Sequence, residues 1–174
     1  MKKQNRSLNL VLSLLPFILA LVVFVLMFFD AAVLRNNNGD IIGQYSGLQV
    51  SFGFKEAGGL GTNHSIGFNF LLVLAYLLPL LSSILVVVFG IVKKDRLASI
   101  FAIVLAVSFV LSAIALFTLL PATTVHGGIL GINTFATLTD LGYELSFATI
   151  VAAIASLVAA LLSLGQIALG FLRK

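Results

Sequence analysis

The stretch Leu97–Leu120, LASIFAIVLAVSFVLSAIALFTLL, decides the fold because it contains no charged residue over its whole length. The hydrocarbon core of a bilayer is about 30 Å thick, and a helix needs roughly 20 apolar residues to cross it. A chain in lipid must satisfy its own backbone hydrogen bonds, and this stretch lacks the alternation of a membrane β-strand. It is therefore predicted to be a transmembrane helix.

Three further stretches have the same character: Leu8–Phe29, Gly67–Val92 and Leu145–Phe171. The 174 residues are 60% hydrophobic and only 9% charged, whereas soluble domains carry about 25% charged residues. This composition excludes a soluble enzyme and a nucleic-acid-binding protein. We predict an all-α membrane protein, a four-transmembrane-helix bundle in the lipid bilayer that forms a single four-span domain over residues 1–174.

Basic residues gather at one end of the predicted bundle: Lys2, Lys3, Arg6, Lys93, Lys94, Arg96, Arg173 and Lys174. Most acidic residues fall at the other end: Asp30, Asp40, Glu56, Asp140 and Glu144. Because lysine and arginine mark the cytoplasmic side, both termini are predicted to be cytoplasmic in a multi-pass plasma-membrane protein. The alternative is a cleaved signal peptide and a three-span mature chain. The first apolar stretch exceeds the roughly 7–15 residues of a signal-peptide core, which favours an uncleaved anchor.

The two outer loops, residues 30–66 and 121–144, are long enough to hold structure of their own. In the first loop, apolar residues alternate with polar or small ones over the segment Leu48–Lys55, a period typical of a strand. Ile41, Ile42 and Tyr45 are the predicted partner strand, with Ser46 and Gly47 in the turn.

The second loop has candidate strands at Thr123–Val125 and Ile129–Ile132, separated by Gly127 and Gly128. Together the loops predict a small extracytoplasmic β-hairpin or β-sheet cap over the helices. Because exposed strand edges recruit further strands, the first-loop strand is the candidate partner-binding site. Its residues are Gly47, Leu48, Gln49, Val50, Ser51, Phe52 and Phe54.

Small residues repeat along the third and fourth spans: Ala98, Ala102, Ala106, Ala148, Ala152, Ser156 and Ala160. Small side chains let membrane helices approach closely. These residues are predicted to form helix-packing faces, either within one chain or, as the alternative, between two copies.

No span contains an ionisable residue, the usual marker of ion and proton pathways in membranes. His64, His126, Asp140 and Glu144 all fall in the outer loops but lack a metal-binding spacing. No catalytic motif is present, and the chain has no cysteine. We therefore predict no catalytic residues, no cofactor and no metal. The absence of cysteine and of a large outer domain favours a bacterial plasma membrane.

The layout resembles that of claudin-like tetraspan membrane proteins, which have a long structured first outer loop, a short inner link and a shorter second outer loop. Claudin first loops carry a Gly-Leu-Trp triplet on a strand, and Gly47-Leu48-Gln49 stands at the corresponding place. Gln49 replaces the tryptophan, and Phe52 replaces the first cysteine of the family's disulfide. The resemblance implies a shared layout, and independent arrival at that layout is the alternative.

The predicted function is that of a non-enzymatic structural or partner-binding protein acting through its outer loops. Its predicted partner is another membrane protein or a second copy, with no role for nucleic acid. The alternative is a small channel or transporter subunit that works as an oligomer.

Overall fold

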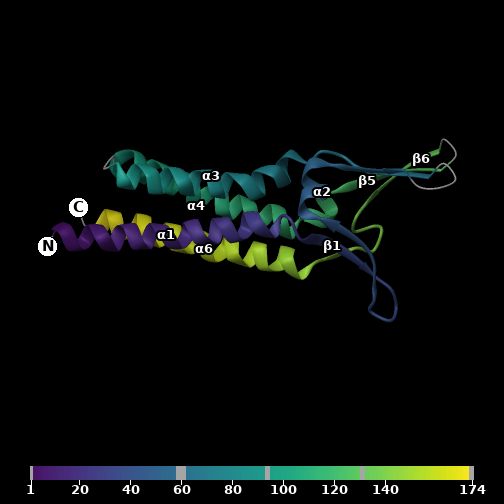
Figure 1. The fold of residues 1–174 in the computed structure, drawn as a ribbon, viewed down its shortest axis with the longest axis horizontal. Helices are drawn as coiled ribbons and strands as arrows, with labels where there is room; N and C mark the ends of the chain where they lie inside the picture. Colours follow the sequence, from purple (N-terminus) through teal and green to yellow (C-terminus); the bar gives the residue numbers. More distant parts are fainter. Residues whose placement is uncertain (1, 58–61, 93–94, 130–131, 173–174) are drawn as a thin grey trace.

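The computed structural model describes residues 2–57, 62–92, 95–129 and 132–172, and it is mostly helical with two small β-sheets. The four long helices are α1 (Lys2–Leu26), α3 (Phe70–Ile91), α4 (Asp95–Phe117) and α6 (Phe147–Leu172). They lie side by side, with α1 and α4 each packed against both α3 and α6 (Figure 1).

Three of these helices, α3, α4 and α6, are long and apolar enough to cross a membrane. The apolar stretches are Phe70–Ile91, Arg96–Phe117 and Phe147–Ala168, each of 22 residues. At about 1.5 Å per residue each is about 33 Å long, which matches a bilayer core. In α1 the corresponding stretch among the described side chains is shorter, Leu14–Leu26.

The helix ends differ slightly from the predicted spans, for local reasons. The second predicted span begins at Gly67, but α3 begins at Phe70 because the Asn69 side chain caps it, accepting a hydrogen bond from Leu72 N. Likewise, α4 ends at Phe117, and the chain continues after Thr118 into the short helix α5 (Leu119–Ala122).

The outward surface of the helices is apolar, and their contact faces hold the small and polar residues. Large side chains such as Ile18, Leu81, Ile114 and Leu161 are exposed, whereas six serines on the long helices are buried: Ser82, Ser83, Ser108, Ser112, Ser156 and Ser163. A water-soluble bundle has the opposite arrangement. This surface is suited to lipid, as expected of a membrane protein.

The predicted helix-packing residues lie on α4 and α6, which pack against each other. Ala106, Ala152, Ser156 and Ala160 are buried within the single chain, whereas Ala98, Ala102 and Ala148 are half-buried. The Ser112 and Ser156 hydroxyl oxygens lie 3.1 Å apart and join the two helices by a hydrogen bond.

Beyond one end of the helices lies the β region, which comprises the strands and the short helix α2 (Gly47–Phe52) (Figure 1). Sheet A has the strand order β2-β1-β7, with β1 (Asp30–Arg35), β2 (Ile41–Ser46) and β7 (Glu144–Leu145). Sheet B has the order β3-β4-β5-β6, with β3 (Phe54–Ala57), β4 (Thr62–Ile66), β5 (Thr124–Ile129) and β6 (Ile132–Thr137).

Two parts of the predicted hairpin arrangement are wrong. The strand at Ile41–Ser46 exists, but it pairs with β1 and not with the segment that follows it. In the second loop, β5 continues through Gly127 and Gly128 to Ile129 before β6 begins. The two glycines predicted to separate the strands are therefore part of a ladder, and residues 130–131 lie outside the described part of the chain.

Buried hydrogen bonds fasten the β region to the helices. The Ala31 carbonyl at the start of β1 accepts hydrogen bonds from Ser146 N (3.0 Å) and Thr149 Oγ1 (2.9 Å), where α6 begins. The Ser146 hydroxyl also donates to the Asp30 carbonyl. The base of sheet A is thereby fixed to the end of the helix bundle.

Candidate functional site

The segment predicted as the partner-binding strand is mostly a helix. Residues Gly47–Phe52 form α2, which begins with a reciprocal cap. The Ser46 hydroxyl accepts from Gln49 N (3.3 Å), and the Gln49 side chain accepts from Ser46 N (2.9 Å). This Ser-x-x-Gln capping box starts a helix where the alternation of apolar residues indicated a strand. The prediction was wrong because the local capping signal outweighed the period-two pattern.

The predicted residues in α2 belong to the core and not to an exposed edge. Val50 and Ser51 are fully buried, Gly47 is buried, and Leu48 and Gln49 are half-buried. Phe52 is about half exposed, and Phe54 lies in β3 and packs against the core. The Gly47-Leu48 pair that carries the claudin-like resemblance thus lies on a helix, and the resemblance stays a prediction.

Sheet B presents one row of side chains across its exposed face. The strands pair without interruption, and Lys55, Ser65, His126 and Phe135 stand at successive positions of one row. The neighbouring row contains Ile66 and Val125, which are buried in the core. The His126 and Phe135 rings meet edge to face, with centroids 4.9 Å apart. The Lys55 row therefore faces away from the protein interior.

Three of the four outer strands of the two sheets have features that protect an edge from further pairing. Strand β7 has only two residues, and β2 has an irregular register with β1. Strand β3 has four residues and carries Lys55 and Glu56. Short length, irregularity and charge each discourage strand addition.

Strand β6 has none of these protections over its six residues. Its sequence, INTFAT, is uncharged, its register with β5 is regular, and Phe135 is 67% exposed. No described residue pairs with β6 on the side away from β5. We therefore take the outer edge of β6, centred on Phe135, as the candidate functional site. Sequence analysis missed it because the second predicted strand, Ile129–Ile132, reached only its first residue.

The C-terminal end of β6 is closed by a turn. The Asp140 carboxylate accepts hydrogen bonds from Thr137 N (3.0 Å) and Thr137 Oγ1 (2.7 Å). These bonds hold the pKa of Asp140 below its ordinary value of 3.8. Because Thr137 N is used by Asp140, it faces away from β5, and the free part of the edge lies before Thr137.

Lowering the pH is expected to weaken this turn. The pKa of Asp140 is depressed in the folded state, so its stabilisation is complete above the ordinary value and is lost as the pH falls through the lowered one. Thr137→Val removes the hydroxyl donor but keeps the backbone donor, so it should raise the pKa of Asp140 towards its ordinary value. A carbon-13 NMR titration of the carboxyl group measures this, and an unchanged midpoint would contradict it.

The four residues considered for a metal site are not gathered into one. His64 pairs with Gly127 and His126 with Ser65 on neighbouring strands, which puts the two histidine side chains on opposite faces of sheet B. Asp140 lies in the turn after β6, and Glu144 lies in sheet A. Within the described ranges, no group of three or more potential metal ligands is found.

An open cleft of about 330 Å³ lies at the base of sheet B, where the chain enters α3 and leaves α5. Its lining consists of Gly67, Phe68, Asn69, Phe70, Ala122, Thr123, Thr124 and His126. The Asn69 amide donates to the Ala122 carbonyl (3.1 Å) and ties the two sides together. Among the described residues of this lining, His126 is the one with an ionisable side chain.

The chain matches no protein-family model, no curated protein and no solved structure, so its own geometry carries the functional argument.

Proposed function

We propose that the protein is a four-span plasma-membrane protein whose β region lies outside the cell and binds a protein partner by strand addition at β6. In this topology both termini are cytoplasmic. The distribution of basic residues supports the orientation, since eight of the ten fall outside the two outer-loop segments, and Lys2, Lys3, Arg6 and Arg96 lie at the helix ends opposite the β region. The three long apolar helices support the membrane location. Helix α1 packs against α3 and α6 and is the proposed fourth span.

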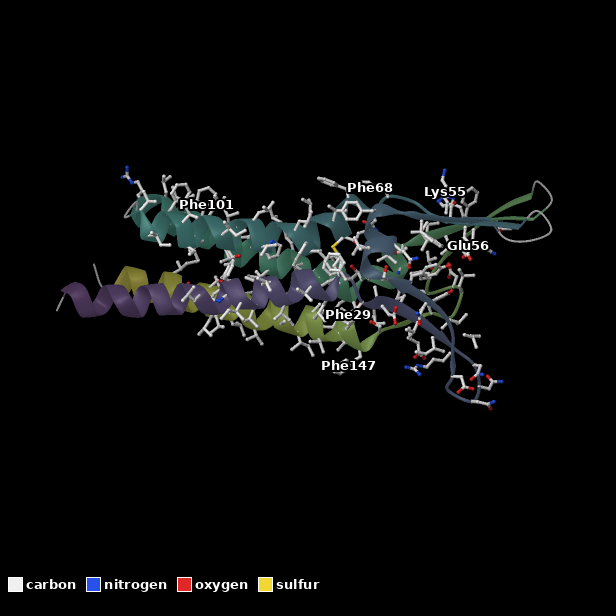
Figure 2. The ribbon with its side chains drawn as sticks, viewed as in Figure 1. Phe29, Lys55, Glu56, Phe68, Phe101 and Phe147 are labelled. Carbon is white, nitrogen blue, oxygen red and sulfur yellow. The ribbon has the colours of Figure 1, made fainter. Side chains whose placement is uncertain are left out.

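The positions of exposed phenylalanine side chains support a proposed depth of the protein in the bilayer. They surround the junction of the helices with the β region: Phe28, Phe29, Phe68, Phe70, Phe117 and Phe147. Figure 2 shows Phe29, Phe68 and Phe147 at a similar level along the bundle. In water these rings would form an exposed apolar surface of a kind that soluble monomers avoid. Lipid that reaches this level covers them and leaves both sheets in water.

The observation that carries the proposed function is the unprotected edge of β6. Strand addition supplies affinity through main-chain hydrogen bonds and specificity through alternate side chains. Phe135 supplies an exposed aromatic anchor at the centre of the strand, and aromatic anchors carry much of the binding energy in protein interfaces. The proposed function is non-enzymatic binding by sheet B, which contributes Ile66 and Val125 to the core beside the helices.

Phe135→Lys is expected to reduce partner binding about 30-fold, which corresponds to the roughly 2 kcal/mol of an interface hot spot. The new charge also protects the edge in the way that natural edges are protected. The measurement is co-purification from native membranes after mild solubilisation, with the amount of bound protein quantified against the bait.

Ile42→Lys is the matched control, because Ile42 is 63% exposed on β2, the irregular edge of the other sheet. It receives the same charge and should retain the partner. Retained binding in Phe135→Lys, with loss in Ile42→Lys, would place the interface on sheet A and refute the role of β6.

A further inference from the structure

We infer that the strand that adds to β6 is β3 of a second copy of this chain, so that sheet B continues from molecule to molecule in the plane of the membrane. This inference rests on the proposed topology and on strand addition at β6. It assigns the partner, the second edge and the register.

Strand direction favours this pairing over a two-fold one. Sheet B extends away from the helices along the long axis of the molecule (Figure 1), so its strands stand roughly along the membrane normal in the proposed topology. Two copies in one membrane point the same way, and their β6 strands would run parallel to each other. Because all neighbours in sheet B are antiparallel, β3 runs opposite to β6. Only β3 of the next copy extends the sheet in its own antiparallel pattern.

The backbone N–H and C=O groups that face outwards on the two edges also fall at matching positions. In an antiparallel ladder, residues alternate between facing one neighbour and facing the other. Thr137 N faces away from β5, towards Asp140, so the N–H and C=O of Phe135, two residues earlier, also face outwards. The Leu138 N bond to the Thr123 carbonyl (3.0 Å) fits the same alternation.

The pairing along the Lys55 row determines which backbone N–H and C=O groups of β3 face away from the sheet. Phe135 faces away from its partner His126, so His126 bonds to Ser65 and Ser65 turns its groups away from Lys55. The N–H and C=O of Lys55 therefore face outwards, as those of Phe135 do. Lys55 and Phe135 belong to the same row, so they stand at the same height in copies held at one depth by the membrane. The membrane thus places Lys55 opposite Phe135 of the next copy. In this register the outward-facing N–H and C=O groups of the two residues can form main-chain hydrogen bonds with each other.

The side chains at this register are complementary. Lys55 and Phe135 point to the same face of the extended sheet, and an ammonium group next to an aromatic ring is attractive. Glu56 points to the opposite side of β3 from Lys55 (Figure 2) and comes to lie opposite Thr134 of the next copy, which carries no charge that would repel the carboxylate. The charges that protect β3 from unspecific pairing therefore suit β6.

The spacing of strands and helices agrees with the repeat. Four strands at about 4.8 Å place successive copies about 19 Å apart. A bundle two helices wide, with an interaxial distance of about 9 Å and helices about 10 Å in diameter, is also about 19 Å across. Copies joined through sheet B are thus not held apart by their helices. Since the contact uses a different edge on each copy, it is heterologous and forms a row or a ring.

Disulfide cross-linking in native membranes tests the pairing, and because the chain has no cysteine, its introduced thiols are the only ones it carries. Lys55→Cys and Phe135→Cys are placed in two separately tagged copies and co-expressed. Opposed residues of a hydrogen-bonded pair have Cα atoms about 5.5 Å apart, within the range of a disulfide. Within one copy the two positions are three strand spacings apart, about 14 Å, so any bond joins two molecules. Mild oxidation should give a dimer that carries both tags, and a single copy with both cysteines should give a ladder of oligomers.

Matched controls keep the result specific. Glu56→Cys replaces Lys55→Cys with a thiol on the opposite face of β3, and its dimer with Phe135→Cys should fall to the level of the unoxidised sample. Phe135→Cys alone should not link to itself. All three positions are exposed, and the variants should insert and elute in detergent as the unmodified chain does.

The outcomes separate this inference from the proposed function. Absence of the mixed dimer in folded, inserted variants, or dominance of a Phe135→Cys homodimer, overturns the β3–β6 pairing. A photo-crosslinking amino acid at position 135 then decides what remains. An adduct with a different protein keeps strand addition at β6 and refutes self-association, whereas the absence of any adduct refutes both.

Discussion

Gly47→Ala is expected to lower the free energy of unfolding by about 3 kcal/mol, at the upper end of the usual cost of overpacking. A Cβ atom at this position would lie 2.6 Å from the Met27 carbonyl oxygen, 2.9 Å from Met27 Cα and 3.0 Å from the Tyr76 hydroxyl. Two of these neighbours are backbone atoms, which cannot move aside as the end of a flexible side chain can. The added methyl group must therefore push α2 away from the end of α1.

This contact matters because α2 supplies hydrogen-bond donors to the turn that follows α1. Gly47 N donates to the Phe29 carbonyl (3.0 Å), and Leu48 N donates to the Met27 carbonyl (2.9 Å). A shift of α2 lengthens both bonds and leaves carbonyl groups unpaired at a buried junction, which adds to the steric cost. The expected result is a lower unfolding midpoint in detergent micelles, followed by circular dichroism.

Two variants control for the substitution itself. Ser51→Ala changes another buried residue of α2, whose hydroxyl has no hydrogen-bond partner in the described structure, and should leave stability unchanged or raise it. Gly90→Ala lies in α3 with no atom within 4 Å of the added Cβ, and alanine is the better helix former. An unfolding midpoint for Gly47→Ala equal to that of Gly90→Ala would show that α2 does not pack as described.

The helices could be predicted from the sequence because their signal is local and long. An uncharged apolar stretch of the required length has few alternatives, and α3, α4 and α6 begin and end within a few residues of their predicted bounds. The differences arise from single residues such as Asn69, whose capping bond starts α3. These signals are weaker than the hydropathy pattern, yet they set the positions where the β region begins.

The β region was harder to predict because short signals compete there. Ser46 and Gln49 formed a recognisable capping box, but the alternation from Leu48 to Lys55 is an equally local pattern that favours a strand. At Gly127 a neighbour on the next strand favours glycine, since an added Cβ would lie 2.9 Å from Thr134 Oγ1 and would displace that side chain. In a sequence, a glycine needed for the close approach of a neighbouring strand cannot be distinguished from a glycine needed for a turn.

The candidate site depends on pairing between distant segments, which no local pattern contains. Strand β4 ends the first outer loop and β5 follows α5 in the second, and only their pairing makes one four-stranded sheet with β3 and β6 as its edges. Residues Lys55 and Phe135 fall in one row as a result of three successive registers. Sequence alone indicated that the outer loops carry strands, but the identity of the free edge came from the fold.

Ser156→Leu is expected to lower the free energy of unfolding by about 3 kcal/mol, because a large side chain must enter the contact between α4 and α6. Ser156 is fully buried, and its hydroxyl lies 3.1 Å from that of Ser112. Ser156→Ala keeps the space and removes the hydroxyl, which bonds to Ser112 and also donates to the Ala152 carbonyl of its own helix (2.9 Å). A hydrogen bond between membrane helices is worth about 0.6 kcal/mol on average. The difference between the two variants measures the steric part of the contact.

The same pair of variants decides between the two packing alternatives for the small residues of α4 and α6. If Ser156 packs within one chain, Ser156→Leu lowers the unfolding midpoint at every protein concentration, and Val158→Leu, on the exposed side of the same helix, leaves it unchanged. If the small-residue face instead joins two copies, Ser156→Leu should dissociate the oligomer while the monomer keeps its unfolding midpoint. Detergent unfolding and sedimentation of the same samples distinguish the two, and the buried Ser112–Ser156 bond within the single chain leads us to expect the first.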